Sequence, residues 1–346
     1  MSSPTLLVDF PAVVKSKVLE KLDIHSILKL RKVCHNLRQF IDENPPKFDS
    51  FTVEVRTIEE SISIIMDSSK YVMNIWNKQT ESIDFRSDRN GCIIQWMDSN
   101  KVRKEMVEKG NFIDVFLREF GIIMKNHSTR VLNSFSINLC QGEHGEQVLE
   151  ELTKIRCVST DEVVFDGCTV DQIAKFLPFF NSNDLNKIRI KEHFEPKVED
   201  QENPIRMLNL QEIRQLEQWK NSKHVNVEAV DFYIRIQDFL HFEQVRVNCK
   251  MISIQDIVLL KESFLTSPAL TSFYIQVYDY FNEIEELHAS LGFPSLPVDQ
   301  GNPEEIWLFR IPNNEDVLRV ICNMEDLFYF RRIKIQNVPE GAVIRD

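Results

Sequence analysis

Residues 9–42 read DFPAVVKSKVLEKLDIHSILKLRKVCHNLRQFID, and this stretch determines the fold of the N-terminal part of the chain. Its apolar residues recur at the spacing of short amphipathic helices, and Pro11 suits the first turn of a helix. A segment of about 35 residues cannot bury so many apolar side chains in a core of its own. We therefore expect the apolar side chains of this segment to pack against another surface, and we favour the surface of a partner protein.

The charge of this segment differs from that of the whole chain. Seven Lys or Arg and three Asp or Glu residues lie between Asp9 and Ile41, a local balance of +4 in a chain whose net charge is −12. A basic, apolar segment is attracted to an acidic groove on a partner. The alternative is a small helical cap on the domain that follows.

The same residues resemble the F-box. The family's Leu-Pro start, Leu-Asp pair and Val-Cys pair read here as Phe10-Pro11, Leu22-Asp23 and Val33-Cys34, and Leu37 stands where many members have Trp. The resemblance implies a three-helix module that docks on a Skp-type adaptor and, through it, on a cullin ubiquitin ligase. The residues that it assigns to adaptor binding are Phe10, Pro11, Val14, Val18, Leu19, Leu22, Ile27, Leu28, Leu30, Val33, Cys34 and Leu37.

Length and composition limit the remaining possibilities. At 346 residues the chain exceeds the usual size of one hydrophobic core, so we expect two units or one solenoid. The acidic balance argues against a general nucleic-acid surface, and no apolar run approaches the 18 residues of a membrane span. Seven scattered Cys residues indicate free thiols in a reducing compartment, so we expect an intracellular protein, cytoplasmic or nuclear.

The region that follows residues 9–42 mixes strand and helix signals. Residues 58–66 and 106–124 have the apolar spacing of helices. The alternating or apolar runs before and between them predict strands. These predicted strands are Phe51–Val55, Tyr71–Trp76, Ser82–Phe85 and Cys92–Trp96.

Beyond residue 130 short strands alternate with helices. Most strand centres are about 25–33 residues apart, which is the range of stacked strand–helix repeats. The predicted strands are Ser134–Leu139, Glu162–Phe165, Asn186–Ile190, Val230–Ile234, Gln244–Val247, Thr271–Ile275, Glu305–Phe309 and Arg331–Ile335.

Several helices of this region have recognisable starts. Thr169, Asn209 and Ser253 each precede a Gln, Glu or Asp by three residues, as in a capping box. Apolar residues at one-face spacing predict further helices over 284–291 and 317–324.

These patterns predict an α/β chain. We expect the N-terminal helices to be followed by an irregular strand–helix solenoid, similar to a leucine-rich-repeat horseshoe, and a closed doubly wound sheet is the alternative. The expected divisions are an F-box at 6–44, a connecting α/β region at 50–130 and a solenoid at 131–340.

Two later stretches resemble the nematode FTH domain, which commonly follows an F-box. One is Leu216–Lys220, read as LEQWK, and the other is Phe239–Ser267. The clearest similarity covers residues 205–290. It implies a region that recruits a substrate, and it supplies no catalytic residues. We expect Trp219 in this region to be a core residue rather than a contact.

Motifs for catalysis are missing from the sequence. It contains no GxGxxG, no GxxxxGK[ST], no GxSxG, no CxxC and no HExxH. The run Cys140, His144 and Cys157 matches no familiar zinc spacing. We expect no enzyme activity, no cofactor and no metal, although an enzyme of unfamiliar type with a deep polar pocket stays as an alternative.

The expected function is therefore that of a substrate receptor in a Skp–cullin–F-box ubiquitin ligase. An F-box protein that assembles partners without ubiquitination is the alternative. We expect one face of the strands to bind the target protein, with neither nucleic acid nor membrane as partner. The candidate target-binding residues are Arg189, Lys191, Tyr233, Arg235, Arg246, Tyr274 and Gln276.

Overall fold

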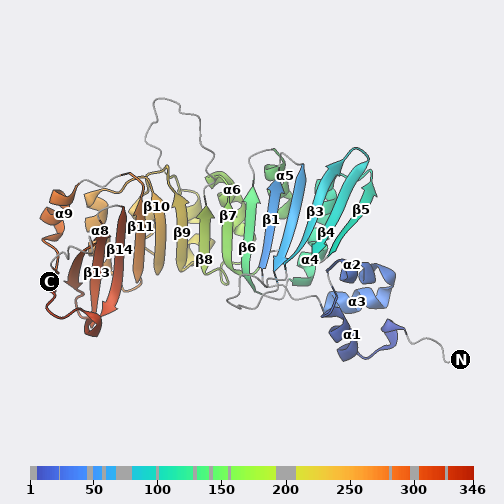
Figure 1. Cartoon of the computed structure of the whole chain (residues 1–346), viewed down its shortest axis with the longest axis horizontal. Coiled ribbons are helices and arrows are strands. Elements are labelled where there is room, and N and C mark those ends of the chain that lie inside the picture. The colour runs from blue at the N-terminus through green and yellow to red at the C-terminus, as the bar shows by residue number, and fades with distance from the viewer. Residues whose placement is uncertain are drawn as a thin grey trace. The chain divides into compact units, whose positions relative to one another are not determined.

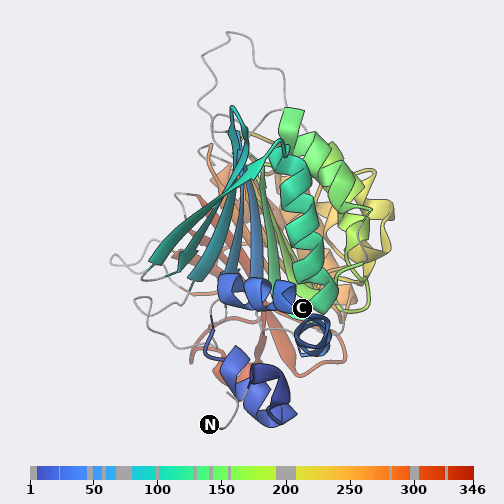
Figure 2. The ribbon, with the colours of Figure 1, turned by 90° about the vertical axis from the view of Figure 1, so that its right-hand side faces the viewer.

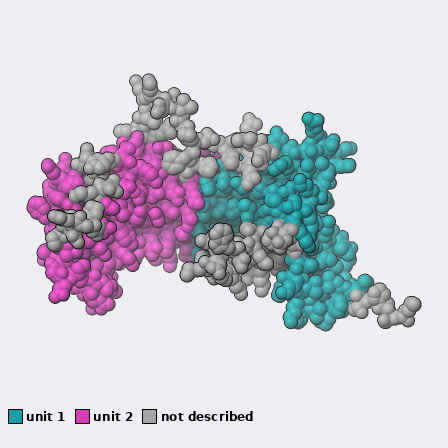
Figure 3. All heavy atoms as spheres, in the orientation of Figure 1, with its two compact units in different colours: residues 1–168, 178–184 teal, residues 169–177, 185–346 magenta. Residues whose placement is uncertain are grey.

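The computed structural model describes residues 6–22, 24–44, 50–56, 60–67, 80–98, 101–127, 131–139, 143–154, 157–191, 208–279, 283–296, 304–323 and 326–346. The chain divides into two compact units (Figure 3). Unit 1 comprises Met1–Cys168 and Pro178–Asp184, and unit 2 comprises Thr169–Leu177 and Leu185–Asp346. Within the described residues no helix is long and apolar enough to cross a membrane.

Unit 1 begins with a group of short helices (Figure 1). The chain leaves the second of these helices at Cys34, whose extended backbone lets the third helix start in a new direction. Pro11 directly precedes the first full helix, where its missing N–H costs no hydrogen bond. The elements are the 3₁₀ turn η1 (Leu7–Asp9) and the helices α1 (Ala12–Leu19), α2 (Ile24–Val33) and α3 (His35–Glu43).

A mixed sheet forms the rest of unit 1, in the order β7-β6-β1-β2-β3-β4-β5. The strands β7, β6 and β1 are parallel, whereas β1 to β5 pair in antiparallel fashion. Gly91 begins β4 at a φ of 149°, and a Cβ there would lie 2.1 Å from the Val107 carbonyl oxygen, so the β3–β4 turn requires glycine. The strands are β1 (Ser50–Arg56), β2 (Ser61–Asp67), β3 (Thr80–Asp88), β4 (Gly91–Asp98), β5 (Lys101–Glu108), β6 (Leu132–Leu139) and β7 (Thr160–Asp166).

Helices α4 (Phe112–His127) and α5 (Glu143–Leu152) complete unit 1. Figure 2 shows α4 along one face of the strands, and it contacts β2, β3 and β4. Phe116 and Phe120 of α4 are fully buried, and their rings lie 5.7 Å from Phe85 and 6.5 Å from Phe135, respectively. This aromatic layer joins α4 to the sheet and forms the core of the unit.

Unit 2 contains a second run of strands, in the order β12-β13-β14-β11-β10-β9-β8. Pairing is parallel from β8 to β11 and antiparallel from β11 through β14 and β13 to β12. The strands are β8 (Lys187–Lys191), β9 (His224–Ala229), β10 (Gln244–Cys249), β11 (Ser272–Val277), β12 (Glu304–Arg310), β13 (Asp316–Asn323) and β14 (Leu327–Lys334).

The helices of unit 2 begin partly where the sequence predicts. The Thr169 hydroxyl accepts from the Gln172 amide and starts α6, and the Ser253 hydroxyl accepts from the Asp256 amide and starts α8, so both predicted caps are confirmed. The cap predicted at Asn209 is wrong, because its side chain closes a turn with the Gln211 amide ahead of a 3₁₀ turn. The helices are α6 (Val170–Phe176), α7 (Glu217–Asn221), α8 (Ile254–Thr266) and α9 (Ile284–Leu291), and the remaining 3₁₀ turns of the chain are η2 (Leu177–Phe179), η3 (Ile213–Gln215), η4 (Ile236–Asp238) and η5 (Ile335–Asn337).

The end of α8 is held by a side chain from a distant strand. The Arg332 guanidinium of β14 donates to the carbonyl oxygens of Phe264, Ser267 and Leu270, with 2.7 Å to Leu270. These carbonyls lie at and beyond the C-terminus of α8, where the helix leaves acceptors unpaired and favours a positive charge. The pKa of Arg332 is lowered by its burial at this position.

The C-terminal segment pairs with the edge strand of unit 2. The Arg345 amide donates to the Leu308 carbonyl at 2.9 Å, and the Arg310 amide donates to the Arg345 carbonyl at 2.6 Å. The Val343 amide also donates to the Ser295 carbonyl at 3.1 Å. The last residues of the chain thus lie along β12.

The predicted solenoid is wrong. A solenoid would repeat one parallel strand per unit. Here the strands from β1 to β5 pair in antiparallel fashion, and so do the consecutive neighbours β11, β14, β13 and β12. The α/β class and most strands of the parallel runs are confirmed. The regular spacing of about 25–33 residues did not exclude antiparallel pairing, because β13, which was predicted as a helix, lies inside the last of these intervals.

Four individual predictions are also corrected. Residues 58–66 and 317–324 were predicted as helices, but β2 and β13 lie there, and the predicted helix over 106–124 begins only at Phe112, after β5. β2 is buried on both faces, and β13 carries apolar residues on both of its faces, so neither sequence shows the apolar–polar alternation of a half-exposed strand. The strand predicted at Val230–Ile234 lies six residues earlier, at His224–Ala229. The strand predicted at Tyr71–Trp76 is outside the described residues.

Candidate protein-interaction surfaces

Helices α1 to α3 share a small core. Leu19, Ile27 and Ile41 are buried together, and Leu22, Leu30 and Phe40 pack against them while partly exposed. Each helix therefore contributes to one apolar cluster, which fixes how the three helices lie against one another.

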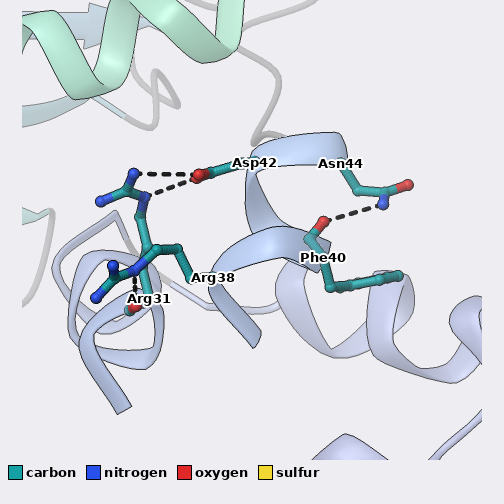
Figure 4. A network of polar contacts seen from close by, with 5 residues as sticks. All are labelled: Arg31, Arg38, Phe40, Asp42 and Asn44. Atoms are coloured by element: carbon teal, nitrogen blue, oxygen red, sulfur yellow. Dashed lines mark hydrogen bonds and ion pairs between the residues drawn. The ribbon is translucent and has the colours of Figure 1, made fainter. Parts of the chain in front are cut away.

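A polar network joins α2 to α3 (Figure 4). The Arg31 guanidinium donates to both carboxylate oxygens of Asp42, at 2.6 and 3.1 Å. Arg38 donates to the Arg31 carbonyl at 3.3 Å, and the Asn44 side chain donates to the Phe40 carbonyl at 3.0 Å. The Arg31–Asp42 pair is largely shielded from water, and its two-point geometry makes it the strongest contact of the network.

Replacing Arg31 with Met is expected to loosen α3. The substitution leaves the half-buried Asp42 carboxylate without its partner, at a cost of about 1–3 kcal/mol. Amide hydrogen exchange in α2 and α3 should therefore accelerate by about 10-fold. Arg38→Met is the matched control, because Arg38 is exposed and makes one long hydrogen bond. Equal exchange in the two variants would contradict the role of the Arg31–Asp42 pair.

The same helices contact the sheet of unit 1 through His25. The buried His25 ring lies 4.4 Å from the Trp96 ring of β4, and its Nδ1 accepts from the Arg103 guanidinium of β5 at 2.9 Å. Because guanidinium only donates, His25 Nδ1 must carry the lone pair. The helical module is therefore tied to the sheet by a side chain within its own second helix.

The structure divides the predicted adaptor-binding residues into three groups. Four are exposed: Phe10, Pro11, Val14 and Val33. Four are half-buried: Val18, Leu22, Leu30 and Cys34. Four are in the interior and can only support the surface from beneath: Leu19, Ile27, Leu28 and Leu37.

An apolar surface remains on the first helix. Val13 is 68 % exposed, and Phe10 and Val14, three residues before it and one after it, are 38 % and 39 % exposed. Val33, at the end of α2, is 67 % exposed. We name Phe10, Val13 and Val14 the α1 patch. Val13 is not among the residues predicted to bind the adaptor, although its place between two predicted positions was a sufficient signal.

The strands of unit 2 have two different faces. One face is apolar: Val225 of β9, Val245 of β10, Phe273 of β11 and Phe330 of β14 are neighbours in the register and buried. The opposite face carries polar residues at the alternate positions. The row of neighbouring residues on this open face is Arg189, Asn226, Arg246, Tyr274, Tyr329 and Ile321.

Five of the predicted target-binding residues lie on this open face. Arg189 and Lys191 belong to β8, Arg246 belongs to β10, and Tyr274 and Gln276 belong to β11. These positions were selected from the alternation of residues that prove to be strands, which is why they fall on one face.

The remaining two predicted residues do not lie in the sheet. Tyr233 and Arg235 lie between β9 and η4, because the strand predicted at 230–234 is absent from that position. Arg319 of β13 also lies on the open face but was not predicted there, because residues 317–324 have the apolar spacing of a helix. Tyr329 and Arg331 of β14 are two further residues of this face that were not predicted. Strand alternation at 327–334 was the available signal for the latter two.

Burial makes four of the cysteines poor nucleophiles. It raises the pKa of Cys92 to about 11 and the pKa of Cys168, Cys249 and Cys322 to about 12. These thiols are therefore protonated at neutral pH, whereas the thiolate is the reactive form. No group of three potential metal ligands is found among the described His, Cys, Asp and Glu residues.

Comparison with known proteins gives two family matches. The F-box domain model matches residues 7–49 and the FTH domain model matches residues 143–289. The chain is 28 % identical over 321 residues to F-box A protein 224 of Caenorhabditis elegans, an alignment that covers 90 % of this chain and 76 % of the relative. No solved structure matches the chain.

Proposed function

Because the chain carries an F-box and an FTH domain, we propose that it is a substrate receptor of a Skp–cullin–F-box ubiquitin ligase. F-box proteins generally fill this role. In this proposal the F-box, residues 6–44, docks on the Skp-type adaptor, and residues 131–340 hold the target protein. Residues 50–130 connect these two regions. The complex would assemble inside the cell, in the cytoplasm or the nucleus.

The observation that supports adaptor docking is the exposed apolar surface of the F-box. The α1 patch and Val33 are exposed although they belong to a module with its own core. Exposed apolar residues gathered on one element mark protein–protein contacts. Lys17, Lys21, Lys29 and Lys32 of the same module are also exposed, and their positive charge favours an acidic partner.

In the proposed mechanism this chain brings the target protein close to the ubiquitin-conjugating enzyme and contributes no catalytic side chain. The adaptor and cullin would hold a charged ubiquitin-conjugating enzyme, and this chain would hold the target within reach. Binding of both partners raises the effective concentration of target lysines at the enzyme. No side chain of this protein then takes part in the transfer, so the chain itself is not an enzyme.

The polar open face of unit 2 is the proposed target surface. Its residues alternate with a fully buried apolar face, so the polar side chains project from a rigid sheet. A rigid sheet positions side chains more accurately than loops do. Tyr233 and Arg235 stay as secondary candidates beside it.

The test is reconstitution of the full chain with a Skp-type adaptor and a cullin. We expect the three proteins to co-elute in size-exclusion chromatography, and proximity labelling under proteasome block to recover the adaptor together with ubiquitinated clients. Co-elution with the adaptor but not with the cullin would instead support an assembly protein that acts without ubiquitination. Failure to bind the adaptor would refute the proposal.

A further inference from the structure

Two arginines face each other on the open face of unit 2. Arg319 of β13 and Arg331 of β14 are direct partners in the antiparallel register. Side chains at such positions are neighbours, with Cβ atoms about 5 Å apart, and like charges there destabilise a sheet. An anion bound between the two guanidinium groups would cancel this repulsion and stabilise the sheet.

The described part of the chain supplies no such anion. Neither Arg319 nor Arg331 forms an ion pair with any residue that the structure describes. The Arg319 Nε atom is moreover buried without a hydrogen-bond partner among those residues. The guanidinium groups of Arg319 and Arg331 therefore have no carboxylate partner within the described chain, and their N–H donors can serve an anion of another molecule.

A third arginine and two tyrosines continue the cluster. The Arg246 guanidinium of β10 lies over the Tyr274 ring at 4.4 Å, and the Tyr274 ring lies 6.1 Å from Tyr329. Tyr329 is two residues from Arg331 on the same face of β14. We name Arg246, Tyr274, Arg319, Tyr329 and Arg331 the arginine–tyrosine patch. It crosses four neighbouring strands, a width of about 14 Å at the usual strand spacing.

The charge of the whole open face of unit 2 is opposite to that of the chain. The chain carries −12, but basic residues dominate this face, and Glu228 and Glu304 are its acidic members. An acidic partner would be attracted to this face. The basic residues of the face are Lys187, Arg189, Lys191, Arg246, Arg310, Arg319 and Arg331.

We propose that the arginine–tyrosine patch binds an acidic segment of the target protein, an inference that rests on the proposed function. Aspartate and glutamate side chains of that segment accept from the guanidinium groups, which match carboxylates with two parallel hydrogen bonds. Aromatic or aliphatic side chains between the acidic ones lie against Tyr274 and Tyr329. The arginines are spread over four strands, so they meet several separate carboxylates.

A protein segment fits this surface better than a nucleic acid does. Glu228 and Glu304 share the face with the arginines, and the chain as a whole repels a polyanion. Nucleic-acid surfaces instead place continuous positive charge along the phosphate backbone. The patch is local, and it suits a short acidic segment.

The inference is tested with a fluorescein-labelled peptide in which Glu and Asp alternate with Leu and Tyr. The peptide is about 12 residues long, enough to cross four strands. Fluorescence anisotropy is measured with the full chain, both alone and in the presence of its adaptor. We expect Arg319→Gln combined with Arg331→Gln to weaken peptide binding at least about 10-fold, and added salt to weaken binding to the unaltered protein. The melting temperature should stay constant or rise by about 1–3 °C, because the substitutions remove the like-charge pair.

Lys175→Gln combined with Lys220→Gln is the matched control. These exposed lysines lie on helices α6 and α7 and carry the same total charge. An equal loss of binding in the control, equal binding of a Gln/Asn version of the peptide, or tighter binding of a single-stranded RNA would overturn the inference. Absence of peptide binding with intact adaptor binding would overturn it while leaving the proposed function in place. Peptide binding without adaptor binding would refute the proposed function alone.

Discussion

Val14→Glu combined with Val33→Glu is expected to abolish co-purification of the Skp-type adaptor. Both side chains are exposed in this chain, at 39 % and 67 %, so the substitutions should leave the F-box folded. In the complex each new carboxylate would be buried without a partner, at a cost of several kcal/mol. Because about 1.4 kcal/mol is a factor of ten, the affinity should fall more than about 100-fold. Pull-down and isothermal titration calorimetry measure the loss.

The control places the same charges elsewhere on unit 1. Val102→Glu combined with Val131→Glu changes two exposed valines of β5 and of the residue before β6. We expect this variant to bind the adaptor as the unaltered chain does. Adaptor binding that survives Val14→Glu with Val33→Glu would show that the exposed surface of the F-box is not the docking surface.

Trp219→Ala is expected to cost about 3–5 kcal/mol in the free energy of unfolding, the range for a large aromatic side chain removed from a core. Trp219 is 1 % exposed, and its ring lies 5.0 Å from Phe242 and 6.1 Å from Phe239. The prediction that this residue is a core residue is thereby confirmed. Chemical denaturation followed by circular dichroism measures the change.

Replacing Trp219 with Phe should cost much less. The Trp219 indole N–H has no hydrogen-bond partner among the described residues, so the smaller ring removes no polar contact. Trp307→Phe is the matched comparison, because the Trp307 indole donates to the Gly292 carbonyl at 2.7 Å. We expect Trp307→Phe to cost about 1–3 kcal/mol more than Trp219→Phe. Equal losses would mean that the Trp219 N–H has an acceptor after all.

The F-box could be located from the sequence because its residue types are fixed over the whole motif. Three helices need only local periodicity, and that periodicity is plain from Pro11 to Ile41. Which apolar residues face inward could not be predicted equally well. Leu28 and Leu37 are buried, but one helical period does not separate the core face from an adjoining contact face.

The parallel strands could be predicted because one apolar and one polar face alternate along each of them. This alternation placed Arg189, Arg246 and Tyr274 on the open face correctly. It failed at β13, where Val317 and Ile321 are apolar although they share a face with Arg319. A strand with apolar residues on both faces can match the spacing of a helix, as Val317, Val320 and Ile321 do, so the position of Arg319 in the arginine–tyrosine patch could not be predicted.

The C-terminal segment has a consequence for self-association. An edge strand exposes a row of backbone donors and acceptors that can template a strand from another molecule. At β12 the Arg310 amide and the Leu308 carbonyl are already paired with Arg345, so these two groups cannot form hydrogen bonds with a strand of a second molecule. At β5, the edge strand of unit 1, the exposed side chains of Lys101, Lys104 and Glu108 place charge along the edge, which disfavours its burial against an apolar strand.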